Sequence, residues 1–230
     1  MSYAIFDLDG TLIDFEGISG EALRTVTKRG GAVREFSTKL HSSILGTPAA
    51  YWSKRLVEEL EIPHLTPLQL IDEYHSELFK LFPRLTLMPG AANLLRSLRD
   101  RNIPVAIATS SASHSVPKKL VNHPIISECT TVIVTGDDPL VRNGKPSPDI
   151  FQLAAKRLGC PEIDFSKCIV FEDAPSGVLG GIRAGMRVIA IPDNRYLSRE
   201  NRGEIFDHPN VTVVSSLEHV DVDVIFSTPI

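Results

Sequence analysis

Asp7 and Asp9 stand two residues apart, directly after a short apolar stretch near the start of the chain. Two carboxylates at the end of a strand can project to the same side, where one can attack phosphorus while the other transfers protons. An Asp-x-Asp-Gly sequence is also typical of a turn stabilised by local hydrogen bonds. The pair alone therefore leaves both interpretations open.

Hydroxyl side chains follow a second apolar stretch, at Thr109, Ser110 and Ser111. Hydroxyls and backbone N–H groups at the mouth of a strand can hold phosphate oxygens. The same residue types favour the N-cap of a helix. This cluster is consistent with either role.

A lysine and two acidic residues complete the candidate set. Lys145 stands beside Pro146 and Pro148, which stiffen the approach to a helix, and its ammonium could neutralise both a phosphate and a nucleophilic carboxylate. An exposed loop lysine is the alternative. Glu172 and Asp173 directly follow a third apolar stretch, where acidic groups are costly without a partner such as a hard cation. A helix N-cap is the alternative for this pair.

The charges of these residues favour a metal ion. Asp7, Asp9, Glu172 and Asp173 supply four negative groups, and Lys145 returns one positive charge. A phosphate dianion would be repelled by that surplus, which a divalent cation corrects. Because all the candidate ligands are oxygens, the sequence predicts Mg²⁺ rather than zinc as the cofactor.

Six short apolar runs predict buried strands, because a strand covered on both faces of a parallel sheet shows no alternation. They cover residues 3–6, 105–108, 132–134, 168–171, 187–191 and 211–214. Helical stripes lie between them, as at Leu94, Leu95 and Leu98. Strands that alternate with helices predict an α/β fold with a doubly wound, mostly parallel sheet.

The segment 15–84 interrupts this alternation with helical patterns and no convincing strand. We interpret it as an inserted helical cap over the carboxyl edge of the sheet. The sheet domain then comprises residues 1–14 and 85–230. The last residues, about 220–230, give no clear pattern.

The bulk composition excludes several classes of protein. The chain has 230 residues, 43% of them hydrophobic and 23% charged, as in ordinary globular proteins. A net charge of −4 without a basic face argues against a nucleic-acid partner, and Lys118 and Lys119 are interpreted as a solvated helix face. Three unpaired cysteines argue against a disulfide framework or a zinc site. With no signal peptide and no spanning segment recognised, we expect a cytoplasmic protein without a membrane partner; the oligomeric state is not readable.

Taken in order, the four clusters resemble the four motifs of the haloacid dehalogenase (HAD) superfamily. The matching segments are 6–12, 108–111, 144–151 and 171–177. The helical insert after the first motif resembles the C1 cap of that superfamily. The resemblance implies a phosphatase with an aspartyl-phosphate intermediate and a small phosphorylated metabolite as its partner.

The resemblance also implies the roles of individual residues. Asp7 is the expected nucleophile, and Asp9 is the expected general acid and base. Thr109, Ser110 and Lys145 are expected to bind the phosphoryl group, with Lys145 also contacting the nucleophile.

The expected metal ligands are Asp7, the main-chain carbonyl of Asp9, and Asp173. Glu172 is expected to support these ligands and not to contact the metal itself. Within the superfamily, segments 87–91, 106–111, 136–139 and 170–178 are most similar to the pseudouridine-5′-phosphatases. This similarity implies pseudouridine 5′-phosphate, or a similar nucleoside or sugar monophosphate, as the substrate.

The resemblance leaves the choice of substrate to the cap. His41, Trp52, His64 and His75 are candidates for contacts with the leaving group. Each could instead lie in the cap core or on its surface.

Three other functions compete with this prediction. A dehalogenase would need neither Asp9 nor the Glu172–Asp173 pair. A phosphomutase of the β-phosphoglucomutase kind shares the four motifs but carries a cap arginine three residues after a glycine, where an ungapped match at Gly46 places Ala49. A non-catalytic binding or regulatory protein of this fold would be expected to lack Asp7 or Asp9, and both are present.

Overall fold

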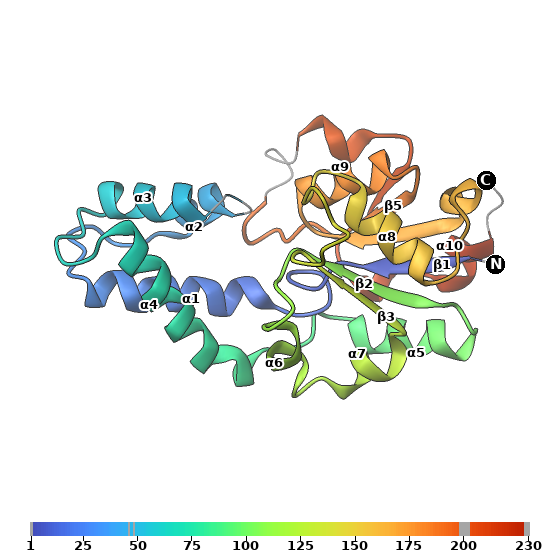
Figure 1. The fold of residues 1–230 in the computed structure, drawn as a ribbon, viewed down its shortest axis with the longest axis horizontal. Coiled ribbons are helices and arrows are strands. Elements are labelled where there is room, and N and C mark those ends of the chain that lie inside the picture. The colour runs from blue at the N-terminus through green and yellow to red at the C-terminus, as the bar shows by residue number, and fades with distance from the viewer. Residues whose placement is uncertain (1, 46, 48, 198–202, 228–230) are drawn as a thin grey trace. The chain divides into compact units, whose positions relative to one another are not determined.

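The chain forms two compact units, Met1–Asp14 with Thr86–Ile230 and, between them, Phe15–Leu85. A computed structural model of the protein describes residues 2–45, 47, 49–197 and 203–227 (Figure 1). The second unit boundary lies one residue beyond the 84/85 division expected from the sequence.

The larger unit is built on a six-stranded sheet with the order β3-β2-β1-β4-β5-β6. Each pair of neighbouring strands is parallel, which confirms the predicted α/β fold with a doubly wound sheet. The strands are β1 (Tyr3–Phe6), β2 (Val105–Thr109), β3 (Val132–Thr135), β4 (Cys168–Glu172), β5 (Arg187–Ala190) and β6 (Val211–Val213). The six apolar runs of the sequence thus all form strands.

The burial of the strands explains why the sequence pattern was so clear. Every residue of β1, β2 and β4 is buried, since these strands occupy the middle of the sheet. The edge strands β3 and β6 keep partly exposed residues. A central parallel strand must be apolar on both faces, and this requirement produces the uninterrupted runs.

Helices cover both faces of this sheet, with α5 and α7 on one side and α8 and α9 on the other (Figure 1). The apolar stripe of α5 is buried at Leu94, Leu95 and Leu98, as the sequence predicted. The helices of this unit are α5 (Ala91–Asp100), α6 (Val116–Leu120), α7 (Pro124–Cys129), α8 (Asp149–Arg157), α9 (Pro175–Arg183) and α10 (Val222–Ser227). Short 3₁₀ turns lie at η2 (Glu162–Lys167), η4 (Glu204–Asp207) and η5 (Leu217–His219).

The order of the strands reverses between β1 and β4. The chain proceeds from β1 to β2 and β3 on one side, whereas β4, β5 and β6 extend the sheet on the other. The rings of Phe6 and Phe171 stack across this junction with their centroids 4.2 Å apart. In open α/β sheets, ligands bind at the carboxyl ends of the strands beside such a reversal. The residues that directly follow β1 and β4 therefore occupy the expected binding position.

The smaller unit is helical, and its described residues contain no strand. Its elements are α1 (Phe15–Arg29), α2 (Thr38–Ile44), α3 (Ala49–Glu59), α4 (Pro67–Leu81) and the 3₁₀ turn η1 (Phe82–Arg84). A capping box at Thr66 and Gln69 starts α4. The role of this unit as a cap stays a prediction.

A cavity of about 140 Å³ lies inside the helical unit, lined by residues that include Ser19, His41, Trp52 and Tyr74. The Ser19 hydroxyl and the Tyr74 hydroxyl are hydrogen-bonded at 2.9 Å. Burial, together with the nearby Arg24 guanidinium, lowers the pKa of His41 to about 4, although the Glu16 carboxylate lies 3.6 Å from Nε2. The cavity therefore presents hydroxyl groups, aromatic rings and an uncharged imidazole beside the Glu16 carboxylate.

The three cysteines, Cys129, Cys160 and Cys168, are free and buried, which confirms that no disulfide framework holds the fold. Among the described residues, no helix is both long and apolar enough to cross a membrane.

Candidate active site

A buried lysine joins two acidic residues at the junction of β1 and β4. Lys145 Nζ donates to Asp7 Oδ1 at 2.5 Å and to Glu172 Oε1 at 2.7 Å. The side chains of Lys145, Asp7 and Glu172 are only 6%, 9% and 1% exposed. The main chain fixes Asp7 beside β4, because its N–H donates to the carbonyl of Phe171 at 2.9 Å.

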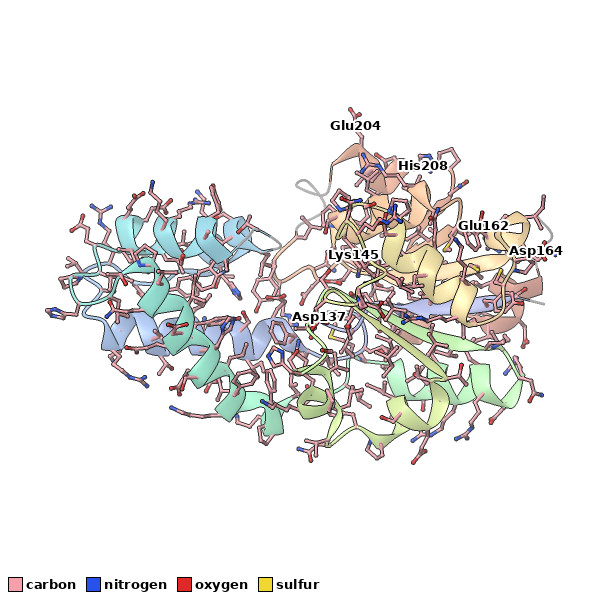
Figure 2. The ribbon with its side chains drawn as sticks, in the orientation of Figure 1. Asp137, Lys145, Glu162, Asp164, Glu204 and His208 are labelled. Atoms are coloured by element: carbon pink, nitrogen blue, oxygen red, sulfur yellow. The ribbon has the colours of Figure 1, made fainter. Side chains whose placement is uncertain are left out.

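Lys145 reaches this site from a loop rather than from a strand. Lys145 and Asp137 both lie on the side of the sheet where the strands end, whereas Glu162 and Asp164 lie on the side where β1 begins (Figure 2). The ammonium also lies 5.0 Å from the centre of the Phe151 ring, at the start of α8. The structure thus brings together Asp7, Lys145 and Glu172, which are widely separated in the sequence.

The burial of these charges perturbs their protonation. Burial, with the nearby Glu172 and Asp9 carboxylates, raises the pKa of Asp7 to about 7 against the opposing effect of Lys145. Burial disfavours the Lys145 ammonium, but the Asp7 and Glu172 carboxylates outweigh it and raise the pKa of Lys145. Lys145 is therefore a permanent cation at neutral pH.

Glu172 holds Lys145 in place and is itself held by the start of α9. Its second oxygen, Oε2, accepts the main-chain N–H of Ala174 at 2.9 Å. A Cβ atom on Gly177 would lie 1.7 Å from Glu172 Oε1. Only glycine at position 177 leaves room for the Glu172 carboxylate that accepts the hydrogen bond from Lys145.

Asp9 is held by a second lysine, which the sequence analysis missed. Lys119 Nζ donates to Asp9 Oδ1 at 2.7 Å and to Oδ2 at 2.6 Å. The Ser111 hydroxyl donates to Asp9 Oδ2 at 2.6 Å and accepts from Lys119 Nζ at 2.8 Å.

The interpretation of Lys119 as part of a solvated helix face was wrong. Lys119 is only 3% exposed, and Val116 and Leu120 of the same helix, α6, are also buried. Residues three and four apart lie on one face of a helix. The positions of Val116 and Leu120 therefore could have predicted that Lys119 faces the interior and that Lys118 faces solvent.

The hydroxyl cluster after β2 has a divided role. Thr109 is fully buried, and its Oγ1 accepts the main-chain N–H of Ser111 at 3.1 Å. Ser110 is exposed, and its carbonyl lies so close to Gly136 that a Cβ atom there would be 2.4 Å away. Thr109 therefore shapes the loop that presents Ser111 to Asp9. Phosphate binding by Thr109 and Ser110 stays a prediction.

Asp173 lies against the turn that carries Asp9. Thr11 Oγ1 donates to Asp173 Oδ1 at 3.2 Å, and a Cβ atom on Gly10 would lie 2.4 Å from Asp173 Oδ2. Gly10 also has a φ of +90°, which favours glycine. Within the residues that the structure describes, no three His, Cys, Asp or Glu side chains are grouped to hold a metal ion.

The Asp9 side chain is one reason why no group of three such side chains forms among the described residues. Its carboxylate is engaged by Lys119 and Ser111, so a metal ligand at this residue would be its main-chain carbonyl. Lys119 also changes the charge of the site. With all four carboxylates ionised, the ammonium groups of Lys119 and Lys145 leave a formal charge of about −2 rather than the larger surplus inferred from the sequence.

Comparison with known proteins agrees with this geometry. Residues 1–185 match the family of haloacid dehalogenase-like hydrolases. The chain belongs to this family. The predicted membership of the HAD superfamily is thereby confirmed.

Several relatives of this HAD-family chain are named phosphatases. It is 38% identical over 196 residues to (DL)-glycerol-3-phosphatase 2 of Arabidopsis thaliana, covering 85% of this chain and 81% of that protein. It is 34% identical over 201 residues to a probable pseudouridine-5′-phosphatase of Drosophila melanogaster, covering 87% and 85% of the two chains. The crystal structure of a β-phosphoglucomutase from Clostridium difficile has a TM-score of 0.73 at 25% identity, covering 99% and 96%.

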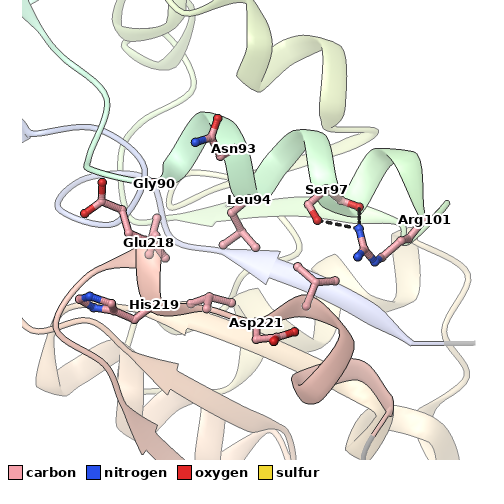
Figure 3. Close-up of a pocket in the computed structure, with 11 residues that line it drawn as sticks. Gly90, Asn93, Leu94, Ser97, Arg101, Glu218, His219 and Asp221 are labelled. Carbon is pink, nitrogen blue, oxygen red and sulfur yellow. Dashed lines mark hydrogen bonds between the residues drawn. The ribbon is translucent and has the colours of Figure 1, made fainter.

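Two cavities of the HAD-like unit lie away from Asp7 and Lys145. A cavity of about 570 Å³ lies between α5 and the segment 217–222 and contains none of the predicted site residues (Figure 3). A cavity of about 380 Å³ is lined by Asp14, Asp193 and Arg195, among others. Arg195 donates to Asp14 Oδ1 at 2.8 Å, a contact that no feature of the sequence indicated.

The cap candidates divide between cavity and surface. His41 and Trp52 line the cavity inside the helical unit, whereas His64 and His75 are exposed. Ala49 is the first residue of α3, and Gly46 lies outside the described residues. The difference from the cap arginine of the mutases therefore stays a prediction.

The substitution Gly177→Ala tests how strongly the site depends on the Glu172–Lys145 contact. The added methyl group overlaps Glu172 Oε1, so Glu172 must move and Lys145 loses one of its acceptors. We expect kcat for p-nitrophenyl phosphate to fall about 100-fold, as a misplacement of roughly 1 Å can cause. Gly144→Ala is the matched control, because a methyl group there meets nothing within 4 Å. An unchanged kcat in a folded Gly177→Ala protein would contradict this dependence.

Proposed function

We propose that this protein is a Mg²⁺-dependent phosphatase that transfers the phosphoryl group of a small phosphomonoester to Asp7 and then to water. The observation that carries the proposal is the buried Lys145 ammonium, 2.5 Å from Asp7 and 2.7 Å from Glu172 at the reversal of strand order. This arrangement places a fixed positive charge beside a carboxylate at the ligand-binding edge of the sheet.

The class of enzyme is supported by the family and by the relatives. The family match and the phosphatases among the relatives bear out the prediction of a phosphoric monoester hydrolase. A non-catalytic protein of this fold is disfavoured, because the proposed nucleophile and the proposed acid–base residue are both present and both held by lysines.

In the first proposed step, an oxygen of Asp7 attacks phosphorus and the bond from phosphorus to the leaving oxygen breaks. For this step Asp9 must carry a proton, which it donates to that oxygen, so the product leaves as an alcohol. In the second step, water attacks the phosphorus of the aspartyl-phosphate while Asp9 takes a proton from the water. The bond from phosphorus to Asp7 breaks, and inorganic phosphate and the starting enzyme are restored.

Lys145 contributes by positioning and by charge. Its ammonium holds Asp7 and can neutralise the oxygens of the transferring group, which carry most of the charge in such transition states. Thr109 and Ser110 are proposed to bind the same oxygens from the loop after β2. These groups are fixed before the substrate arrives, so little reorganisation is needed during the reaction.

The residues of the site fit a magnesium ion. Mg²⁺ is usually held by one or two carboxylates and several waters, and Asp7, Asp173 and the carbonyl of Asp9 are oxygen donors of this kind. The surplus of negative charge favours a divalent cation there, and such a cation would lower the raised pKa of Asp7. When bound, the ion would neutralise phosphate oxygens and help to keep Asp7 ionised.

Two substrates have specific support. The similarity of the chain to a probable pseudouridine-5′-phosphatase favours pseudouridine 5′-phosphate, which remains the proposed substrate. Glycerol 3-phosphate is the second candidate, because a relative named for it is more similar over almost the same length. A mutase reaction is disfavoured by the proposed absence of the cap arginine.

The substitution Asp7→Asn should reduce turnover at least about 1,000-fold, because an amide cannot form the acyl-phosphate. Acid-quenched wild-type protein should carry a phosphoryl group detectable by intact mass, and the variant should not. Asp100→Asn, at the exposed end of α5, serves as the control. Retained turnover in pure Asp7→Asn protein is incompatible with the mechanism.

Removal of the metal with EDTA should abolish activity, and excess Mg²⁺ should restore it. Ca²⁺ should support activity poorly, since it prefers more ligands and longer bonds than an in-line reaction at this site allows. The measurement is phosphate release from p-nitrophenyl phosphate in metal-depleted buffer. Full activity without a divalent ion would instead support dehalogenase-like chemistry.

A comparison of kcat/KM across pseudouridine 5′-phosphate, glycerol 3-phosphate, a hexitol phosphate and FMN tests the substrate. We expect pseudouridine 5′-phosphate to be best, because discrimination depends on contacts with the leaving group. A tenfold or larger advantage of glycerol 3-phosphate would replace it with the second candidate. Activation by a sugar bisphosphate with an isomerised product would point to a mutase.

A further inference from the structure

Lys119 occupies an unusual position for a charged side chain. It lies on α6 between Val116 and Leu120, which are 3% and 7% exposed, and is itself only 3% exposed. Burying an ammonium group is costly unless it is paired and hydrogen-bonded. A methionine or leucine would continue the apolar face of the helix without that cost. Packing alone therefore does not explain a lysine at this position.

The partners of Lys119 show where its charge is directed. Its ammonium lies within 2.7 Å of both carboxylate oxygens of Asp9 and 2.8 Å from Ser111 Oγ. The Ser111 hydroxyl donates to Asp9 Oδ2 as well. Both oxygens of the carboxylate are thus engaged, and Asp9 cannot rotate without losing at least one of these bonds.

The side chains of Lys119 and Asp9 differ in exposure, as proton transfer by Asp9 requires. Lys119 is 3% exposed, whereas the Asp9 side chain is 19% exposed. The lysine therefore contacts Asp9 from the protein interior, and part of the Asp9 side chain stays exposed. A group that must exchange protons with a substrate oxygen and then with water needs a fixed direction and one accessible side.

We propose that Lys119 is a positioning residue that, together with Ser111, orients the Asp9 carboxylate for both of its proton transfers. The inference rests on the proposed function of Asp9 as general acid and base. Lys119 differs in this respect from Lys145, which contacts the proposed nucleophile. The two lysines thus serve different carboxylates and different parts of the reaction.

A positioning role makes the effect of removing Lys119 depend on the leaving group. Phenyl phosphate releases a poor leaving group and needs a proton from Asp9, whereas p-nitrophenyl phosphate releases a good one and needs little help. Hydrolysis of the aspartyl-phosphate needs Asp9 as a base with either substrate. Lys119→Met should therefore impair the first step only for phenyl phosphate and the second step for both.

The experiment measures both substrates with wild-type, Lys119→Met and Ser111→Ala enzyme in the presence of Mg²⁺. For Lys119→Met we expect kcat/KM for phenyl phosphate to fall at least about tenfold more than for p-nitrophenyl phosphate. With p-nitrophenyl phosphate, rapid mixing should show a burst of p-nitrophenol, with the ratio of burst rate to steady-state rate raised at least about tenfold. Ser111→Ala should change both quantities in the same direction and by less.

The matched control is Lys118→Met, which alters the exposed neighbour on the same helix and should leave both quantities unchanged. The burst amplitude counts the folded sites, so a loss of folded protein lowers the amplitude without changing the ratio of rates. Equal losses with the two substrates and no change in that ratio would overturn the inference. A wild-type enzyme that forms no phosphorylated Asp7 would instead refute the proposed function.

Discussion

The site depends on one interaction, the ammonium group of Lys145 buried between the carboxylates of Asp7 and Glu172. Three charged groups that are nearly excluded from water remain compatible with folding only when each is paired, and removing one partner of such a pair costs about 3–5 kcal/mol. The surrounding structure meets this demand. The stacked rings of Phe6 and Phe171 hold β1 against β4, and the absence of a side chain at Gly177 leaves space for Glu172.

A second, smaller network of hydrogen bonds holds Asp9 in a similar way. Lys119 and Ser111 engage both oxygens of its carboxylate, while Asp7 belongs to the Lys145 network. Two carboxylates that are only two residues apart in the chain are therefore held by different lysines from different segments. This separation allows one to serve as the proposed nucleophile and the other as the proposed acid and base, because each has its own environment.

The division into two units suggests how one chemistry serves several substrates. All the residues proposed for phosphoryl transfer belong to the sheet-containing unit, and the helical unit holds a cavity lined by its own hydroxyl, ring and carboxylate groups. Relatives named for glycerol 3-phosphate and for pseudouridine 5′-phosphate are similar to this chain over comparable lengths. Such a pattern is expected when few residues choose the leaving group and many maintain the phosphoryl site.

The six strands, the α/β class and the acidic clusters at the strand ends could all be predicted from the amino-acid sequence. Central parallel strands must be apolar throughout, and this local requirement is visible in runs such as residues 168–171. Lys119 was misjudged, although the stripe of Val116 and Leu120 carried the signal that its side chain points inward.

Only the tertiary structure decided the strand order and the partners of the charged residues. Lys145 lies 138 residues from Asp7, and Lys119 lies 110 residues from Asp9. The space that Gly177 leaves for Glu172 likewise appears only when α9 is placed beside β4. Periodicity reports whether a residue is buried, because burial repeats with the local geometry of a helix or strand. Which buried charge meets which partner depends on how distant segments pack, and no local pattern contains that information.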